Sequence, residues 1–526
     1  MKRLLPFFLL LIAGYSVAQK NMTQLGVYTF PFQNLSGCWH YTDTADGREY
    51  GLIGAQNGIA FLDITQPSNP QFLFQLPGNT STWHEVKVWG DYAYAVSEGI
   101  DTLGVKNGVQ VMDLRYLPDS VPYRFWQGDS AMPGTLVTAH TVTVDGGYLY
   151  INGHNLNQLG RGVIICSLTD PWNPAYVGAV TNNYSHDSYV RNGRLYSSEI
   201  LAGQFAVYDI TNPAAPALLA TQSTPGLFNH NTWLSDNGQV IFTTDERGNQ
   251  PVTSYDISDL SNITKLDEYK TVITPQYEVH NVRVLNDYVI NPSYGSQLTI
   301  ADGSRPDNII EVANYPTGNY LCWDADPYLA SGAIMATDMY FQKVYLFQPT
   351  YVRACYLEGT VTDSVTGLPL SNVAVSLVGS PVVKNSNNVG DYRTGSVDTG
   401  SYDVIFARQG YRTKLVSGVS LQTGQVTALN VQLAPENIGV GEIAFEKLLR
   451  IAPQPASDRL FFQTDKSGSL KLTISDITGK FVLGCEAVMT GGQTSSLDLT
   501  GLENGVYLLR AEIAGACASR RIVVLH

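Results

Sequence analysis

Apolar and polar residues alternate along most of the chain in short runs that are rich in β-branched and aromatic side chains. Residues 194–198, 204–210 and 217–222 are three such runs, and turns containing Gly, Asn or Asp-Pro separate runs of this kind. Alternation with a period of two indicates half-buried β-strands, whereas an amphipathic helix would repeat every 3.6 residues or so. The pattern therefore predicts an all-β protein.

The strand-like runs are grouped into a repeat that begins at a histidine. Six of the eight histidines occupy this repeat position, and a seventh copy has aspartate there. The copies begin at His40, His84, His140, His186, His230, His280 and Asp324. Intervals of roughly fifty residues suit a four-stranded propeller blade. Residues 19–350 are therefore predicted to form a seven-bladed β-propeller, and six blades with an irregular cap is the alternative.

The two ends of the repeat region predict how the ring closes. The seventh copy supplies only three strands, whereas an unpaired strand-like run at residues 23–30 precedes the first copy. Pairing this run with the seventh blade would complete that blade and remove an exposed edge. Cys38 and Cys322 stand two residues before His40 and Asp324, so we expect a disulfide between neighbouring blades, and two buried thiols are the alternative. Cys485 and Cys517 form a second candidate pair.

The first residues and the overall charge indicate export. Residues 1–18 have a basic start, an apolar stretch and small residues before position 19. This is the pattern of a secretory signal peptide, which is too short to span a membrane, and no other apolar run reaches spanning length. A net charge of −14 argues against a nucleic-acid partner. We therefore expect an exported protein without a transmembrane segment in its mature form.

Residues 355–434 have a different pattern, with short strand-like runs at 357–361, 374–377 and 400–404 and a turn sequence at 367–370. This segment resembles the carboxypeptidase regulatory-like domain, a transthyretin-like β-sandwich. The resemblance implies a role in spacing or adhesion. A linker is predicted at residues 435–446.

Residues 447–526 begin with a Pro-rich segment, 452–456, and continue with Asp-Ile-Thr-Gly-Lys at 476–480 and Gly-Val-Tyr-Leu-Leu at 505–509. This region resembles the C-terminal sorting domain of type IX secretion, although Gln454 stands where that family usually has asparagine and His526 replaces the usual final lysine. The resemblance implies a second small β-sandwich and the type IX secretion machinery as partner. It also implies either release from the cell or attachment to its surface.

The propeller region resembles the LVIVD-repeat group through the phrases at residues 60–64, 206–210 and 253–257. Bacterial members of this group are called choice-of-anchor B proteins, because similar bodies carry different C-terminal anchors. The resemblance implies the propeller fold and brings no settled chemistry with it. Function must therefore be argued from the residues of the site.

The repeated histidines predict a metal site at one mouth of the central channel. Antiparallel pairing places the end of each second strand beside the start of the innermost strand, which brings Glu98, His154, Glu199 and Glu246 towards the histidines. Neutral imidazole is a ligand of zinc and copper, and nearby carboxylates bind the ion or orient the imidazoles. The alternative is that the histidines form hydrogen bonds between blades, as a structural device repeated by duplication.

Two functions of different classes remain. The first is a non-catalytic surface module that binds an extracellular glycan or protein, favoured by three β-modules in series without a cofactor motif. The second is a metal-dependent secreted oxidase or hydrolase. No nucleophile elbow is present, and Val88 stands where a zincin helix would need a second histidine, so the sequence identifies no catalytic residue. We expect the first function.

Overall fold

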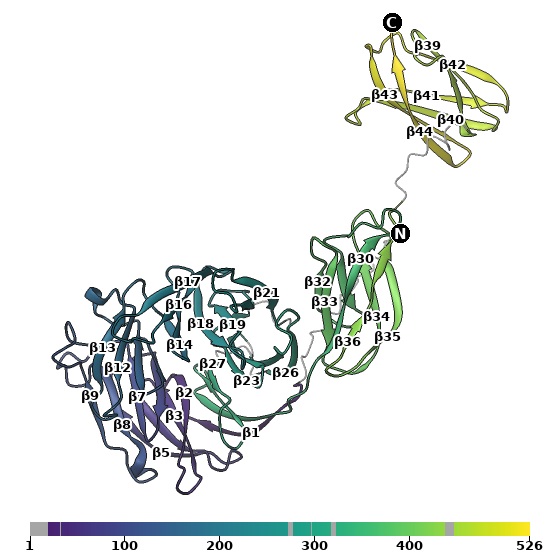
Figure 1. Ribbon diagram of the computed structural model, residues 1–526. Coiled ribbons are helices and arrows are strands. Elements are labelled where there is room, and N and C mark those ends of the chain that lie inside the picture. The colour runs from purple at the N-terminus through teal and green to yellow at the C-terminus, as the bar shows by residue number, and fades with distance from the viewer. Residues whose placement is uncertain (1–18, 32, 272–276, 296, 317–321, 437–446) are drawn as a thin grey trace, which may run out of the picture. The chain divides into compact units, whose positions relative to one another are not determined.

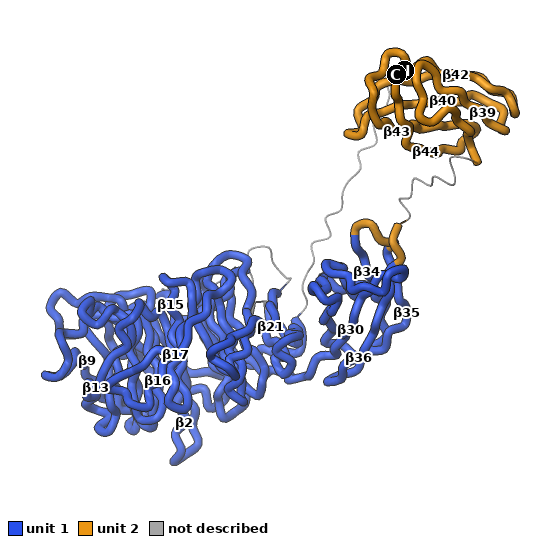
Figure 2. Tube along the Cα trace, turned by 45° about the horizontal axis from the view of Figure 1, so that its top comes forward, with its two compact units in different colours: residues 1–408, 413–433 blue, residues 409–412, 434–526 orange. Residues whose placement is uncertain are grey.

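The computed structural model describes residues 19–31, 33–271, 277–295, 297–316, 322–436 and 447–526. The predicted signal peptide lies outside these residues, as does nearly all of the predicted linker. The chain divides into two compact units, residues 1–408 with 413–433 and residues 409–412 with 434–526 (Figure 2). The regular elements described are almost all strands, which confirms the all-β prediction.

Antiparallel sheets follow one another between residues 22 and 349 and surround a central axis as a β-propeller (Figure 1). Each sheet is given from its inner to its outer strand. The first contains β2 (Leu35–Thr42), β3 (Glu49–Ala55), β4 (Gly58–Asp63) and β5 (Gln71–Pro77), and the second contains β6 (His84–Trp89), β7 (Tyr92–Ser97), β8 (Val109–Asp113) and β9 (Tyr123–Trp126). The third contains β10 (Thr141–Asp145), β11 (Tyr148–Asn152), β12 (Val163–Ser167) and β13 (Ala175–Val180). We number these sheets as blades one to three.

Four further sheets follow among the described residues, and we number them as blades four to seven for reference. Blade four contains β14 (Asp187–Arg191), β15 (Arg194–Glu199), β16 (Gln204–Asp209) and β17 (Ala217–Ser223), and blade five contains β18 (Asn229–Leu234), β19 (Val240–Asp245), β20 (Val252–Asp256) and β21 (Thr264–Tyr269). In blade six, β22 (Glu278–Val279) and β23 (Arg283–Leu285) both pair with β24 (Tyr288–Tyr294), which is followed by β25 (Gln297–Asp302) and β26 (Ile310–Pro316). Blade seven contains β27 (Cys322–Asp326), β28 (Ile334–Asp338) and β29 (Lys343–Pro349).

The ring closes through the N-terminal strand. Strand β1 (Met22–Thr29) pairs antiparallel with β29, from Met22 opposite Pro349 to Thr29 opposite Lys343. The chain start thereby supplies the fourth strand of blade seven and covers an edge that would otherwise be open. The predicted pairing of residues 23–30 with the seventh blade is confirmed.

Hydrophobic clusters between neighbouring blades hold the ring together, and they explain why the predicted cysteine pair does not form. Cys38 and Cys322 are both buried free thiols. Cys38 packs with residues of blades one and seven, whereas Cys322 packs with residues of blades six and seven. Cys322 opens its strand opposite Asp338, but Cys38 lies further along β2, opposite Ile53. The two thiols therefore do not share a repeat position, and the disulfide prediction is wrong.

The rest of the first unit is a smaller β-domain of two sheets. One contains β30 (Cys355–Asp363), β33 (Asp391–Ser396), β36 (Val426–Ala428) and β37 (Val431–Leu433); the other contains β31 (Ala374–Leu377), β32 (Val383–Asn385), β34 (Gly400–Ala407) and β35 (Lys414–Leu421). Buried Asp302 of blade six accepts hydrogen bonds from Arg353, Tyr356 and the amide of Ala354 at 2.7–2.9 Å. This carboxylate ties the small domain to the propeller.

The second unit has its own core and two sheets, as expected for a sandwich. They contain β38 (Arg450–Ala452), β39 (Arg459–Gln463) and β42 (Thr494–Asp498), and β40 (Gly468–Ser475), β41 (Phe481–Met489), β43 (Gly505–Ile513) and β44 (Ala516–Val524). Cys485 on β41 and Cys517 on β44 are free because β40 and β43 lie between their strands, so this predicted pair is also wrong. Among the described residues, no helix has the length and apolar character to cross a membrane.

Candidate metal site at the channel mouth

Strand register decides which repeat residues reach the channel mouth. In blades four, five and seven, the residue that pairs with the penultimate position of the second strand is Asp187, Asn231 or Asp324. The side chain one residue earlier is therefore equivalent in the three blades. Blade two does not follow this pairing, because His84 lies opposite Ser97, the last residue of β7, and it is Trp83 whose ring lies beside His140.

Six side chains form an arc at this level, which we call the mouth ring. Its members are Trp83, His140, His186, His230, His280 and Trp323. Neighbouring ring centroids along the four histidines are 4.0, 4.4 and 4.2 Å apart. Trp323 continues the arc 4.7 Å from His280, and Trp83 lies 6.3 Å from His140 at the other end. Four predicted histidines are thus brought together.

Three other predicted residues lie elsewhere. A shift of one residue along a strand turns a side chain to the opposite face, and His84 is buried outside the ring, near the backbone of Asn79. His40 lies further along β2, opposite Gly51, where its Nδ1 is 2.8 Å from Asp326. Asp324 follows the ring residue Trp323 and belongs to a separate network. These three residues are therefore not part of the mouth ring: Trp83 and Trp323, one residue before His84 and Asp324, lie beside the ring histidines instead, and His40 lies further along its strand.

The predicted neighbours also divide into two groups. Glu98 lies 2.8 Å from Nδ1 of His140, and Glu246 lies 3.7 Å from Nε2 of both His230 and His280. Glu199 instead accepts hydrogen bonds from Asn183, Gln204 and Tyr208, at 2.7–2.8 Å. His154 accepts a hydrogen bond from the amide of Leu156 and lies outside the ring. Only the two glutamates accompany the histidines.

The geometry at Glu246 is suited to a metal ion. His186, His230 and Glu246 each offer one ligand atom, and these three atoms lie within 4.8 Å of one another. His230 donates its Nδ1 proton to the carbonyl of His280 at 3.0 Å, and His280 donates its own to the carbonyl of Trp323 at 2.6 Å. Because each Nδ1 carries the proton, each Nε2 has a free lone pair directed towards Glu246. Buried Nδ1 of His186 has no hydrogen-bond partner among the described residues.

Electrostatics at the site disfavour the protonated imidazoles and the ionised carboxylate. Burial, together with the neighbouring imidazoles, holds the pKa values of His186 and His230 well below the usual 6.5. Burial lowers the pKa of His280 to about 3. Burial and the nearby Glu278 raise the pKa of Glu246 to about 7. A divalent cation would stabilise the carboxylate charge and would bind the imidazoles in their neutral form.

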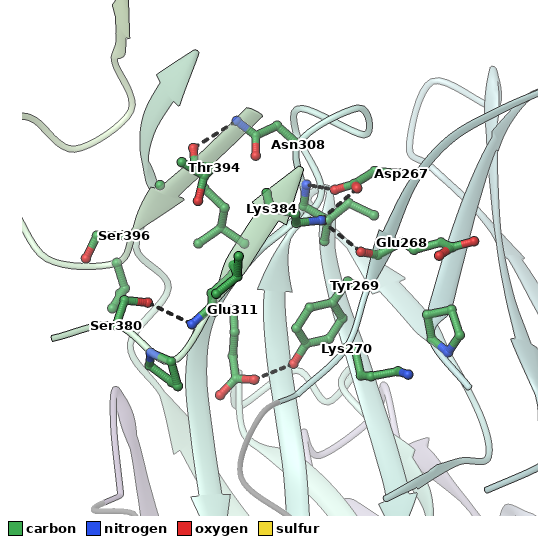
Figure 3. A pocket seen from close by; sticks show the side chains of 18 of the residues that line it. Asp267, Glu268, Tyr269, Lys270, Asn308, Glu311, Ser380, Lys384, Thr394 and Ser396 are labelled. Atoms are coloured by element: carbon green, nitrogen blue, oxygen red, sulfur yellow. Dashed lines mark hydrogen bonds and ion pairs between the residues drawn. The ribbon is translucent and has the colours of Figure 1, made fainter. Parts of the chain in front are cut away.

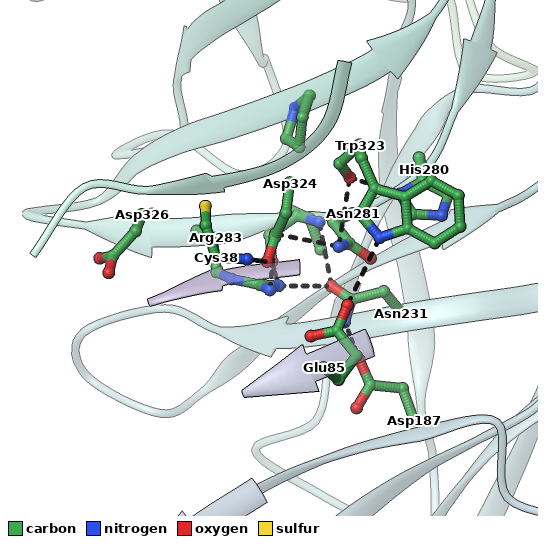
Figure 4. A network of polar contacts seen from close by, with 12 residues as sticks. Cys38, Glu85, Asp187, Asn231, His280, Asn281, Arg283, Trp323, Asp324 and Asp326 are labelled. Atoms are coloured by element: carbon green, nitrogen blue, oxygen red, sulfur yellow. Dashed lines mark hydrogen bonds and ion pairs between the residues drawn. The ribbon is translucent and has the colours of Figure 1, made fainter. Parts of the chain in front are cut away.

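A second polar layer follows the mouth ring, one or more residues further along the innermost strands (Figure 4). Asn231 donates to Asp187 at 2.6 Å, and Asn281 donates to Asp324 at 2.9 Å. Arg283, only 2 % exposed in its side chain, donates to Asp324 at 2.8 Å and to Asn231 at 3.3 Å. We call these five residues the channel network. It links four blades across the axis and uses the residues that directly follow ring positions.

A larger hollow of about 980 Å³ lies between the outer strands of blades five and six and the small domain (Figure 3). Its charged side chains largely pair with one another: Lys384 lies 2.8 Å from Asp267, and Lys265 lies 2.6 Å from Glu268. None of the histidines or glutamates predicted from the repeat lines it. The candidate metal ligands therefore lie outside this hollow, at the mouth ring.

Two segments match known families. Residues 356–434 match the carboxypeptidase regulatory-like domain, and residues 450–525 match the secretion system C-terminal sorting domain. The sorting domain indicates export to the cell surface or the extracellular space, by type IX secretion. No curated protein matches the chain.

Solved structures similar to this chain include two of low sequence identity. The β-propeller domain of Cps50 (Swd1) from Myceliophteria thermophila aligns with a TM-score of 0.45 and 9% identity, covering 61% of this chain and 98% of that domain. A protein from Lactobacillus plantarum aligns with a TM-score of 0.43 and 15% identity, covering 58% of this chain and 89% of its own.

Proposed function

We propose that the protein is an exported surface binding protein whose propeller holds a divalent transition-metal ion at the channel mouth. The observation that carries this proposal is the convergence of His186, His230 and Glu246, with ligand atoms within 4.8 Å of one another. His280 is a further donor, because its Nε2 lies 3.7 Å from Glu246. Imidazole and carboxylate together are a ligand set for zinc or copper.

The hydrogen bonds around the histidines support metal binding over a purely structural role. A structural histidine would be expected to use both ring nitrogens in hydrogen bonds between blades. Here His230 and His280 use Nδ1 for a neighbouring backbone carbonyl and leave Nε2 beside a carboxylate. Fixing one nitrogen in this way orients the other towards an ion.

The wider role that we propose is non-catalytic binding or adhesion at the cell surface, with an extracellular glycan or protein as ligand. Export by the sorting domain and a β-domain attached to the propeller support this role. We also propose that the propeller is seven-bladed and of the LVIVD-repeat, choice-of-anchor B kind. The repeat phrases at residues 60–64, 206–210 and 253–257 support that assignment.

A metal-dependent oxidase or hydrolase is the second candidate, and one observation favours it. Three protein ligands leave a coordination position for water or substrate, as in catalytic zinc sites. Tyr294 forms a hydrogen bond with Glu246 and would lie beside that position. Turnover of a substrate only by the metal-loaded protein would favour this alternative over binding alone.

The experiment that tests the proposal is equilibrium dialysis of the mature protein against Zn²⁺, Cu²⁺, Ni²⁺ and Mn²⁺, followed by elemental analysis. We expect retention of a single ion per chain. Loss of an orienting partner alone costs about 10–100-fold in metal affinity, so removing a ligand should cost more. His186→Ala and the nearly isosteric Glu246→Gln should therefore lose the ion.

His40→Ala is the matched control, because it removes an imidazole of the repeat that lies outside the mouth ring. It should bind metal like the wild-type protein. Absence of uptake of all four metals by the folded wild-type protein would refute the proposal. Full occupancy in both ligand variants would do so as well, since the ion would then be held elsewhere.

A further inference from the structure

Two arginines lie near the mouth histidines, each over an aromatic ring. Arg161 lies in the connection between β11 and β12, and its guanidinium carbon is 5.2 Å from the centre of the Tyr184 ring. That ring stacks with His186 at 6.4 Å between centroids. Arg247 directly follows Glu246, and its guanidinium carbon is 4.7 Å from the Phe228 ring, two residues before His230.

Both guanidinium groups lie over aromatic rings, and Arg161 also interacts electrostatically with Glu98. Among the ion pairs between described residues, neither arginine has a carboxylate partner, although many other arginines of the chain do. Arg161 makes one long hydrogen bond, 3.4 Å, to the carbonyl of His154, and the side chains of both arginines are exposed. An aromatic ring under a guanidinium orients the planar fork and leaves its donors open.

The nearby carboxylates do not remove this positive charge. Glu98 is engaged by His140 at 2.8 Å, and Glu246 faces the two imidazoles of His230 and His280. Glu278 is a third carboxylate near the mouth, close enough to Glu246 to affect it electrostatically. A bound divalent ion would add two positive charges beside the two arginines, so the occupied mouth would carry more cationic than anionic groups.

We propose that the channel mouth binds an oxyanion, a carboxylate or phosphate group, with one oxygen on the metal ion and the others on Arg161 and Arg247. This inference rests on the proposed metal site and names the class of ligand that the site would take. Guanidinium groups match the geometry of carboxylates and phosphates with paired donors. An open coordination position on the metal ion accepts an anionic oxygen. The ligand of the propeller is thus an acidic extracellular molecule.

The test uses Co²⁺-loaded mature protein, because the visible spectrum of bound Co²⁺ changes when an anion enters its coordination sphere. Inorganic phosphate and acetate are the two probes, and the anion with the lower dissociation constant identifies the source of the oxyanion. Hydrogen bonds to charged groups contribute about 1.5–3 kcal/mol each, so the double variant Arg161→Gln/Arg247→Gln should bind the preferred anion at least about tenfold more weakly. Its cobalt content should not change.

Arg48→Gln is the matched control, an exposed arginine in the connection between β2 and β3, at the opposite end of the blades. It should leave anion binding as in the wild-type protein. Cobalt binding without a spectral response to either anion would overturn this inference and leave the metal proposal intact. An unchanged dissociation constant in the double variant would overturn it too. Failure to bind cobalt at all would refute the metal proposal and this inference together.

Discussion

Arg283 provides the sharpest test of how the propeller is held together at its axis. The side chains of Arg283 and Asp324 are 2 % and 0 % exposed and 2.8 Å apart, so Arg283→Ala leaves a fully buried carboxylate without its counter-ion. The remaining donors to Asp324 are Asn281 at 2.9 Å and the amide of Cys38 at 3.4 Å. Removing one partner of a buried ion pair costs about 3–5 kcal/mol. We expect the free energy of unfolding of the propeller to fall by this amount.

Urea unfolding followed by tryptophan fluorescence measures this effect selectively. All seven tryptophans, Trp39, Trp83, Trp89, Trp126, Trp172, Trp233 and Trp323, belong to the propeller. The double variant Arg283→Ala/Asp324→Ala should lose less than the two single variants together, because no unpaired charge remains. Arg48→Ala, which breaks an exposed pair with Asp46, should unfold like the wild-type protein. If the free energy of unfolding falls by less than about 1 kcal/mol for Arg283→Ala, the ion pair between Arg283 and Asp324 does not stabilise the propeller as expected.

Three further predictions concern the ring, pH and export. Deleting residues 19–31 removes β1 and uncovers β29, so the propeller should aggregate or lose cooperative unfolding; an unchanged urea midpoint would count against closure by this strand. Burial lowers the pKa of His84 to about 4, so the unfolded state takes up a proton first and stability should fall as pH drops from about 6.5 towards 4. His84→Leu should reduce this acid-induced loss, and an identical pH profile would refute it. Truncation after residue 446 should leave the propeller folded but inside the cell envelope, and its normal appearance outside would contradict sorting by residues 450–525.

The repeat made the fold predictable from the sequence, because strand alternation and a recurring histidine are local signals. The pairing of β1 with β29 was also predictable, since an unpaired run and an incomplete blade stand at opposite ends of one repeat array. The two disulfides were not. The first prediction assumed that Cys38 and Cys322 share a repeat position, whereas the two strands differ in register.

The same limit applies to the mouth ring. The structure places Trp83 and Trp323 in the ring, one residue before His84 and Asp324, but a shift of one residue is not visible in the spacing of the histidines. Trp-His at 39–40 and 83–84 and Trp-Asp at 323–324 were the available signal, because tryptophan precedes the repeat residue in the three copies whose repeat residue lies outside the ring. Glu98 and Glu246 were predictable because they follow regular second strands.

Anomalous X-ray diffraction from crystals of the mature protein grown with Zn²⁺ tests the central claim most directly, because it locates the ion and its ligands together. The account predicts an anomalous peak among His186, His230 and Glu246, with zinc–nitrogen distances of about 2.0–2.1 Å. Data collected below and above the zinc absorption edge would identify the element. Crystals that show zinc only at other sites, with the mouth-ring imidazoles unliganded, would contradict it.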